Sequence, residues 1–223
     1  MQVEGPAPGE ELHGGAPTEP RQAASVIVLR GGDDALEVLL LRRNPAARFM
    51  GGAWVFPGGA VDECDVAEGE RDEGASRRAG ETDLSSHRMA AVREVEEEAG
   101  LRLPDPDALV EFSRWITPPQ IAIRYDTQFF LAPAPPGQEP RPDGDETVDL
   151  AWHTPAGALA AHGAGQLDLV FPTIKHLEQL AGFESAAALL AWATGRAVVA
   201  VEPQIRFTGE TARVVLPGEP GYR

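Results

Sequence analysis

Residues 89–101, with the sequence MAAVREVEEEAGL, form the segment that most constrains the fold and chemistry of this chain. Glu94, Glu97 and Glu98 stand at i, i+3 and i+4, so a helix places their side chains on one face, away from Val92 and Val95. Like charges at this spacing cost a helix a few tenths of a kcal/mol per pair, roughly, and no lysine alternates with them. The segment predicts either a site for a hard divalent cation or a charged helix facing solvent.

The upstream sequence VFPGG, residues 55–59, favours the cation site. It reads as a short strand that must stop at Pro57, followed by two glycines that free the backbone. With no side chain in the way, the carbonyl of Gly58 can bind the same cation as the helix carboxylates. Two separate segments therefore point to one metal centre.

Together these segments resemble the Nudix hydrolases, whose box reads Gly-x5-Glu-x7-Arg-Glu-U-x-Glu-Glu-x-Gly-U, where U is aliphatic. REVEEEAGL, residues 93–101, matches the second half of the box at every specified position. The first half departs from it, because Gly59 lies 34 positions before Arg93 and the box places 14 there. Counted back from Arg93, the box glutamate falls on Ser85.

The excess length corresponds to residues 62–81, which carry eight acidic and three basic residues and almost no large apolar ones. We expect an inserted surface loop that contributes little to the core. A box interrupted in this way, with RFMGGAWVFPGG before it and WITPPQIAIRYDTQFFLA after it, is similar to the branch that includes the mammalian peroxisomal coenzyme A diphosphatases and their bacterial relatives. This resemblance covers roughly residues 26–183.

The resemblance implies an α/β fold, a Nudix-type α/β/α sandwich with a mixed β-sheet and extra C-terminal helices. Strands are expected at residues 23–30, 36–43, 53–57, 108–116, 121–132 and 147–153, the first two as a hairpin. Helices are expected from a cap at Asp83 or Ser85 to Ala99, and over 154–162, 172–183 and 185–195. Two or three short strands follow after residue 196. We expect residues 1–21 to be a disordered tail and 22–223 to form one domain.

The resemblance also implies hydrolysis of a nucleoside diphosphate linked to another moiety, dependent on Mg²⁺ or Mn²⁺. The metal ligands would be Glu94, Glu97, Glu98 and the carbonyl of Gly58. Arg93 would orient a carboxylate, and the general base would come from the box helix or from Glu146 in a later loop, although Glu146 also reads as an ordinary loop carboxylate.

Arginines outside the box would contact substrate phosphates, the candidates being Arg42, Arg43, Arg48 and Arg124, of which we expect one or two to act. The aromatic residues Phe49, Trp54, Trp115 and Tyr125 either stack on a base or, as is more common in strands, belong to the core.

The net charge of −16 argues against nucleic acid or an anionic membrane as the partner, because both repel an acidic chain. A single cysteine, Cys64, and an N-terminus without an apolar run favour a cytoplasmic protein. The sequence leaves open whether the protein forms a homodimer. The favoured substrate is coenzyme A or an acyl-CoA. Two alternatives remain: ADP-ribose, NADH or a nucleotide sugar as the substrate, or a catalytically silent Nudix-fold protein that binds or regulates.

Overall fold

The computed structural model describes residues 15–66, 84–208 and 211–222. Most of its strands belong to one mixed sheet with the order β3-β2-β1-β6-β5-β8, in which β4 also pairs with β1 and β7 with β2. Their bounds are β1 Arg21–Arg30, β2 Glu37–Arg43, β3 Trp54–Val55, β4 Gly58–Ala60, β5 Val110–Ile116, β6 Tyr125–Pro133, β7 Thr147–His153 and β8 Ala200–Val201. A separate hairpin consists of β9 Gln204–Thr208 and β10 Thr211–Val215.

Strand β1 lies at the centre of the sheet and is buried along almost its whole length. It runs parallel to β6 from Arg21 to Leu29 and meets β2 antiparallel only near Leu29 and Arg30, so the predicted hairpin forms but its strands diverge. Beside the other end of β1, β4 pairs antiparallel with residues 23–25. The near-continuous burial of β1 is typical of a strand that is covered on both faces.

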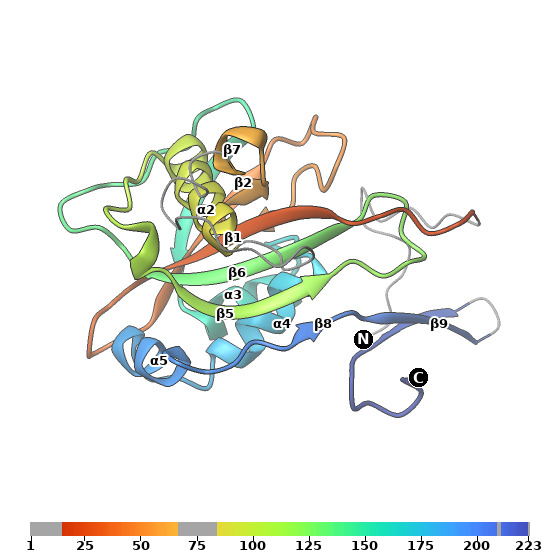
Figure 1. Cartoon of the computed structure of the whole chain (residues 1–223). Coiled ribbons are helices and arrows are strands. Elements are labelled where there is room, and N and C mark those ends of the chain that lie inside the picture. Colours follow the sequence, from red (N-terminus) through yellow and green to blue (C-terminus); the bar gives the residue numbers. More distant parts are fainter. Residues whose placement is uncertain (1–14, 67–83, 209–210, 223) are drawn as a thin grey trace.

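Helices cover both faces of the sheet, as expected for an α/β/α sandwich (Figure 1). On one face, helix α2, Leu84–Ala99, packs over a cluster that includes Val26, Val28 and Phe130. On the other face, α3 Pro155–Gly163, α4 Phe171–Leu180 and α5 Ala186–Ala193 cover a cluster that includes Ile27 and Leu29. Alternate residues of β1 therefore enter opposite cores.

Helix α2 ends where the sequence predicts. Gly100 takes a φ of +64°, and the N–H groups of Gly100 and Leu101 donate to the carbonyls of Glu96 and Val95. This left-handed glycine cap fixes the end of the acidic helix. Ser85 lies inside the helix, and Asp83, the alternative cap, lies outside the described residues. A short 3-10 helix, η1 Pro106–Ala108, precedes β5.

The N-terminal boundary falls earlier than the expected one. Residues 1–14 of the predicted tail lie outside the described residues, and Arg21 is already the first residue of β1. Thr18 donates to the carbonyl of Ala122 and accepts from Arg124, so residue 18 already contacts the domain.

The C-terminal segment continues past α5 into three short strands, which confirms the expected number. Strand β8 runs parallel to β5 at the edge of the sheet, with Trp115 opposite Val201. The β9–β10 hairpin extends beyond this edge and lies on the opposite side of the sheet's strands from α2 (Figure 1). In the described ranges, no helix is long and apolar enough to cross a membrane.

Candidate active site

A cleft of about 1120 Å³ runs from the carboxylates of α2 toward the β9–β10 hairpin. Glu94, Glu97 and Glu98 line it together with Gly58 and Gly59 of β4, as expected. Its other lining residues come from β1, β5, β6, the start of α4 and the C-terminal hairpin. The cleft is large for a pyrophosphate alone, since cavities of about 300–1000 Å³ hold drug-sized ligands.

The glycines of β4 bring the backbone against the acidic helix. The N–H of Gly58 donates to Oε2 of Glu98 at 2.9 Å, and the Glu98 side chain is 4% exposed. A Cβ at Gly59 would overlap the carboxylate of Glu94. Glycine at residue 59 thus leaves the space that Glu94 occupies.

The strand pairing directs the carbonyl of Gly58 away from β1. Hydrogen bonds from Val26 to Pro57 and from Val61 to Gln22 flank the paired residues, so Gly58 stands opposite Ser25 at a non-hydrogen-bonded position. At such a position both the N–H and the C=O point away from the partner strand. The Gly58 N–H reaches Glu98, and its carbonyl lies on the same side as the acidic helix.

Burial raises the pKa values of two carboxylates in the cleft. Burial raises the pKa of Glu98 to about 7, with repulsion from Glu94 and Glu146 adding to the shift and the Gly58 N–H and Arg43 opposing it. Burial also raises the pKa of Glu94, although Arg93 opposes the shift. In both cases the removal of the carboxylate from water outweighs the hydrogen bonds and the nearby arginine that favour its charged form.

Arg93 holds two of the predicted ligands. Its guanidinium donates to Glu94 at 2.8 Å and to Glu97 at 3.0 Å, and also to the carbonyl of Ala60. Arg93 therefore contacts two of the predicted ligands, and its orienting role stays a prediction. Glu97 is the outermost of the three carboxylates, with 59% of its side chain exposed.

Asp65 corrects the interpretation of the interrupted box. Its carboxylate is 3% exposed and receives two hydrogen bonds from Arg93, at 3.1 and 2.8 Å. Counted forward from Gly59, Asp65 stands at the position of the box glutamate, so placing that position at Ser85 was wrong. The expectation that all of residues 62–81 lies at the surface was wrong for Asp65, because Arg93 requires a buried acid; residues 67–81 lie outside the described residues.

Glu146 lines the cleft at its carboxylate end, in an exposed position. Its backbone is fixed on both sides. The carbonyl of Glu146 accepts from Asn44, and the neighbouring Thr147 hydroxyl donates to the carbonyl of Glu98 at 2.9 Å. Asp143 caps this turn by accepting from the N–H groups of Asp145, Glu146 and Thr147.

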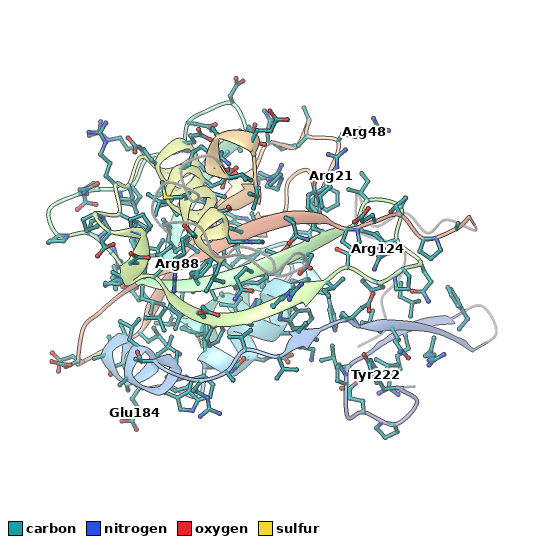
Figure 2. The ribbon with its side chains drawn as sticks, viewed as in Figure 1. Arg21, Arg48, Arg88, Arg124, Glu184 and Tyr222 are labelled. Carbon is teal, nitrogen blue, oxygen red and sulfur yellow. The ribbon has the colours of Figure 1, made fainter. Side chains whose placement is uncertain are left out.

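The candidate arginines fall in different places. Arg43 lines the cleft, with Nη1 3.8 Å from Glu98. Arg48 and Arg42 are exposed and lie outside the cleft lining, and Figure 2 shows Arg48 at the outer edge of the molecule. Arg124 is buried and donates to the carbonyls of Thr117 and Thr18 and to Glu202, so its donors face protein acceptors rather than the cleft.

The donors at the carboxylate end suit a hard divalent cation in their chemistry. They are three carboxylates and the carbonyl of Gly58, which points away from β1, so all of them are oxygen ligands. A bound cation would stabilise the charged forms of Glu94 and Glu98, whose pKa values are raised. In the part of the chain that the structure describes, no three acidic, histidine or cysteine side chains already form a cage for a metal ion. The guanidinium of Arg93 binds Glu94 and Glu97 instead.

Comparison with known proteins gives a consistent picture. The model of the NUDIX domain matches residues 19–172. Acyl-coenzyme A diphosphatase NUDT19 of Homo sapiens is 25% identical over 92% of this chain and 81% of its own length, and that of Gallus gallus is 26% identical over 91% and 79%. The crystal structure of a NUDIX hydrolase from Alicyclobacillus acidocaldarius covers 81% of this chain and 99% of its own, with 28% identity and a TM-score of 0.69.

Proposed function

Because this chain belongs to the Nudix hydrolase family, we propose that it is a divalent-cation-dependent pyrophosphohydrolase whose substrate is coenzyme A or an acyl-CoA. Membership of the family confirms the resemblance predicted from the sequence, and the likeness to the NUDT19 enzymes supports the branch of the coenzyme A diphosphatases. The chain is therefore a pyrophosphatase rather than a silent binding protein. The observation that carries the proposal is the buried Glu98, fixed by the N–H of Gly58 and flanked by Glu94 in a large cleft.

The residues of this chain supply the binding and orientation. Asp65 holds Arg93, and Arg93 in turn holds Glu94 and Glu97 on the side of the cleft. Glu94, Glu97, Glu98 and the carbonyl of Gly58 would hold Mg²⁺ or Mn²⁺, which neutralises the diphosphate and lowers the pKa of attacking water. Glu146, which lines the same end of the cleft, would take the proton of that water.

Arg43 is our candidate for the contact with substrate phosphate. It is the one predicted phosphate-binding arginine whose side chain lines the cleft, while its position 3.8 Å from Glu98 keeps it beside the carboxylates. A guanidinium in this place can pair with a phosphate oxygen of the diphosphate.

A coenzyme A compound as the substrate is supported by the likeness to the two NUDT19 enzymes, whose name states acyl-coenzyme A. ADP-ribose, NADH and nucleotide sugars share the pyrophosphate and remain the alternative. The cytoplasmic location and the homodimer expected from the sequence stay predictions, which cell fractionation and light scattering would test.

The test is a turnover assay with the full chain against coenzyme A, ADP-ribose and NADH, with Mg²⁺, with Mn²⁺ and with EDTA. We expect coenzyme A to give 3′,5′-ADP and phosphopantetheine, and EDTA to abolish the reaction. Equal or better turnover of ADP-ribose or NADH would refute coenzyme A as the substrate while leaving the pyrophosphatase standing. Full turnover in EDTA would refute the metal dependence.

A further inference from the structure

The two ends of the cleft differ in charge. Among the described residues that line it, the only cations are Arg43 and Arg93, and both lie against the carboxylates of α2. The end next to the hairpin is lined mainly by apolar side chains, including Trp115, whose ring lies 6.2 Å from that of Phe171. The described residues at this end offer a phosphate no charged partner, which favours an uncharged group as the occupant.

The hairpin supplies one wall of this apolar end. Ile205 and Phe207 alternate along β9 and therefore share a face, and Val214 stands directly opposite Ile205 on β10. All three line the cleft. Phe207 is 57% exposed, which leaves a large apolar side chain beside the cleft without a cover from the described part of the chain.

The wall is an addition to the family's common domain. The family model ends at residue 172, whereas β9 begins at Gln204. The hairpin is nevertheless fixed to the body, because β8 pairs with β5, Arg124 pairs with Glu202 at 2.8 Å, and the Tyr222 hydroxyl donates to the carbonyl of Glu202. Figure 2 shows Tyr222 and Arg124 on either side of this junction. The apolar face is therefore held toward the cleft.

We infer that the β9–β10 hairpin binds the acyl chain of a fatty-acyl thioester of coenzyme A, with the chain packed on Ile205, Phe207 and Val214. This inference rests on the proposed function and names the substrate class within it. Cleavage at the carboxylate end needs only the diphosphate, and an acyl chain supplies the apolar area that covers the exposed ring of Phe207. A nucleobase stacked on Trp115 is the competing occupant, and the experiment separates the two.

The experiment measures kcat/KM for coenzyme A and for its acetyl, octanoyl and dodecanoyl thioesters, below their micelle concentrations. In the wild type, kcat/KM is expected to rise roughly tenfold from coenzyme A to the dodecanoyl thioester. In Phe207→Ala this ratio should fall to about twofold, and Phe207→Leu should restore most of it. Val199→Ala is the matched control, since Val199 is also exposed and apolar in the C-terminal segment but lies outside the cleft.

Each outcome of these assays bears on the inference or on the proposed function. An equal loss on all four compounds in Phe207→Ala would show that the hairpin holds the nucleotide and would overturn the inference. A flat wild-type response to chain length, with coenzyme A itself hydrolysed, would overturn it while leaving the proposed function intact. Absence of turnover on every coenzyme A compound, with ADP-ribose hydrolysed, would overturn both. Because Phe207 is largely exposed, thermal unfolding should show all the variants folded.

Discussion

The two ends of the cleft are built in contrasting ways. At the carboxylate end, buried polar groups hold one another: Gly58 fixes Glu98, and Asp65 fixes Arg93, which holds Glu94. At the hairpin end, a two-stranded ribbon beyond the sheet's edge presents an exposed apolar face. Changes at the first end disturb an interlocked network, whereas changes at the second alter contact area alone. Chemistry and substrate choice can therefore vary separately.

The largest effect should come from Glu98→Gln, which keeps the shape of the side chain and removes its charge. We expect kcat to fall on the order of 100- to 1000-fold, because the substitution removes the charge of a proposed metal-binding carboxylate. The readout is turnover at saturating Mg²⁺, with Val214→Ala as the comparison, which should alter only the preference among acyl thioesters. Wild-type turnover in Glu98→Gln would contradict the metal-site assignment.

Asp65→Ala should destabilise the protein by about 3 kcal/mol, because it removes the most deeply buried of the acids that bind Arg93. The matched control is Asp62→Ala, whose carboxylate is 66% exposed and lies 3.9 Å from Arg93. That change should cost less than about 0.5 kcal/mol. Urea unfolding measures both. Equal, small losses would show that the start of the insertion does not stabilise the carboxylate end.

The pKa of Glu98, raised by burial to about 7, predicts a pH effect on the metal-free protein. The contribution of Glu98 to the free energy of unfolding is fully present below the ordinary glutamate pKa and is lost as pH rises through about 7. The free energy of unfolding of the wild type should therefore fall by roughly 2 kcal/mol relative to that of Glu98→Gln over this range. The measurement is thermal unfolding in EDTA from pH 5 to 8.

The comparison of the wild type with Glu98→Gln is needed because burial lowers the pKa of His176 to about 3. This histidine destabilises the folded protein as pH falls below 6.5, which is the opposite pH dependence to that of Glu98. Both proteins contain His176, so its effect cancels in the difference. Parallel pH profiles for the two proteins would contradict the raised pKa of Glu98.

The smallest expected effect is the difference in KM between substitutions of Arg43 and Arg48. Arg43→Gln should raise KM about tenfold, because Arg43 lines the carboxylate end, whereas Arg48→Gln at an exposed position should stay within about twofold. Steady-state kinetics with coenzyme A measures both. A larger effect from Arg48 would mean that substrate extends beyond the described cleft at this edge.

The sequence predicted that the three helix glutamates lie together and where their helix ends, because this information is local. The spacing of Glu94, Glu97 and Glu98 within one helix already determines their common face, and Gly100 marks the end of that helix. Asp65 was missed because the box was counted back from Arg93 across the insertion. Counting forward from Gly59 would have found it.

The remaining errors concern contacts between distant parts of the chain. The partners of Arg124, Thr18 and Glu202, are separated from it by 106 and 78 residues, so its role as a structural anchor cannot be read from its neighbours. The short strands near the C-terminus were expected, but their place beside the cleft depends on the pairing of β8 with β5. A hydrophobic pattern predicts that a strand forms, but it does not predict which strand it pairs with.

The charge of the cleft lining bears on how the reaction cycle ends. Among the described residues, seven carboxylates and two guanidinium groups line the cleft, in a chain with a net charge of −16. With the proposed metal site, the cations would hold anionic products, and the negative field of the described lining would push those products out. We expect weak product inhibition and exit rates that slow as salt screens the repulsion, so that the acidity of this enzyme favours rapid release rather than tight capture.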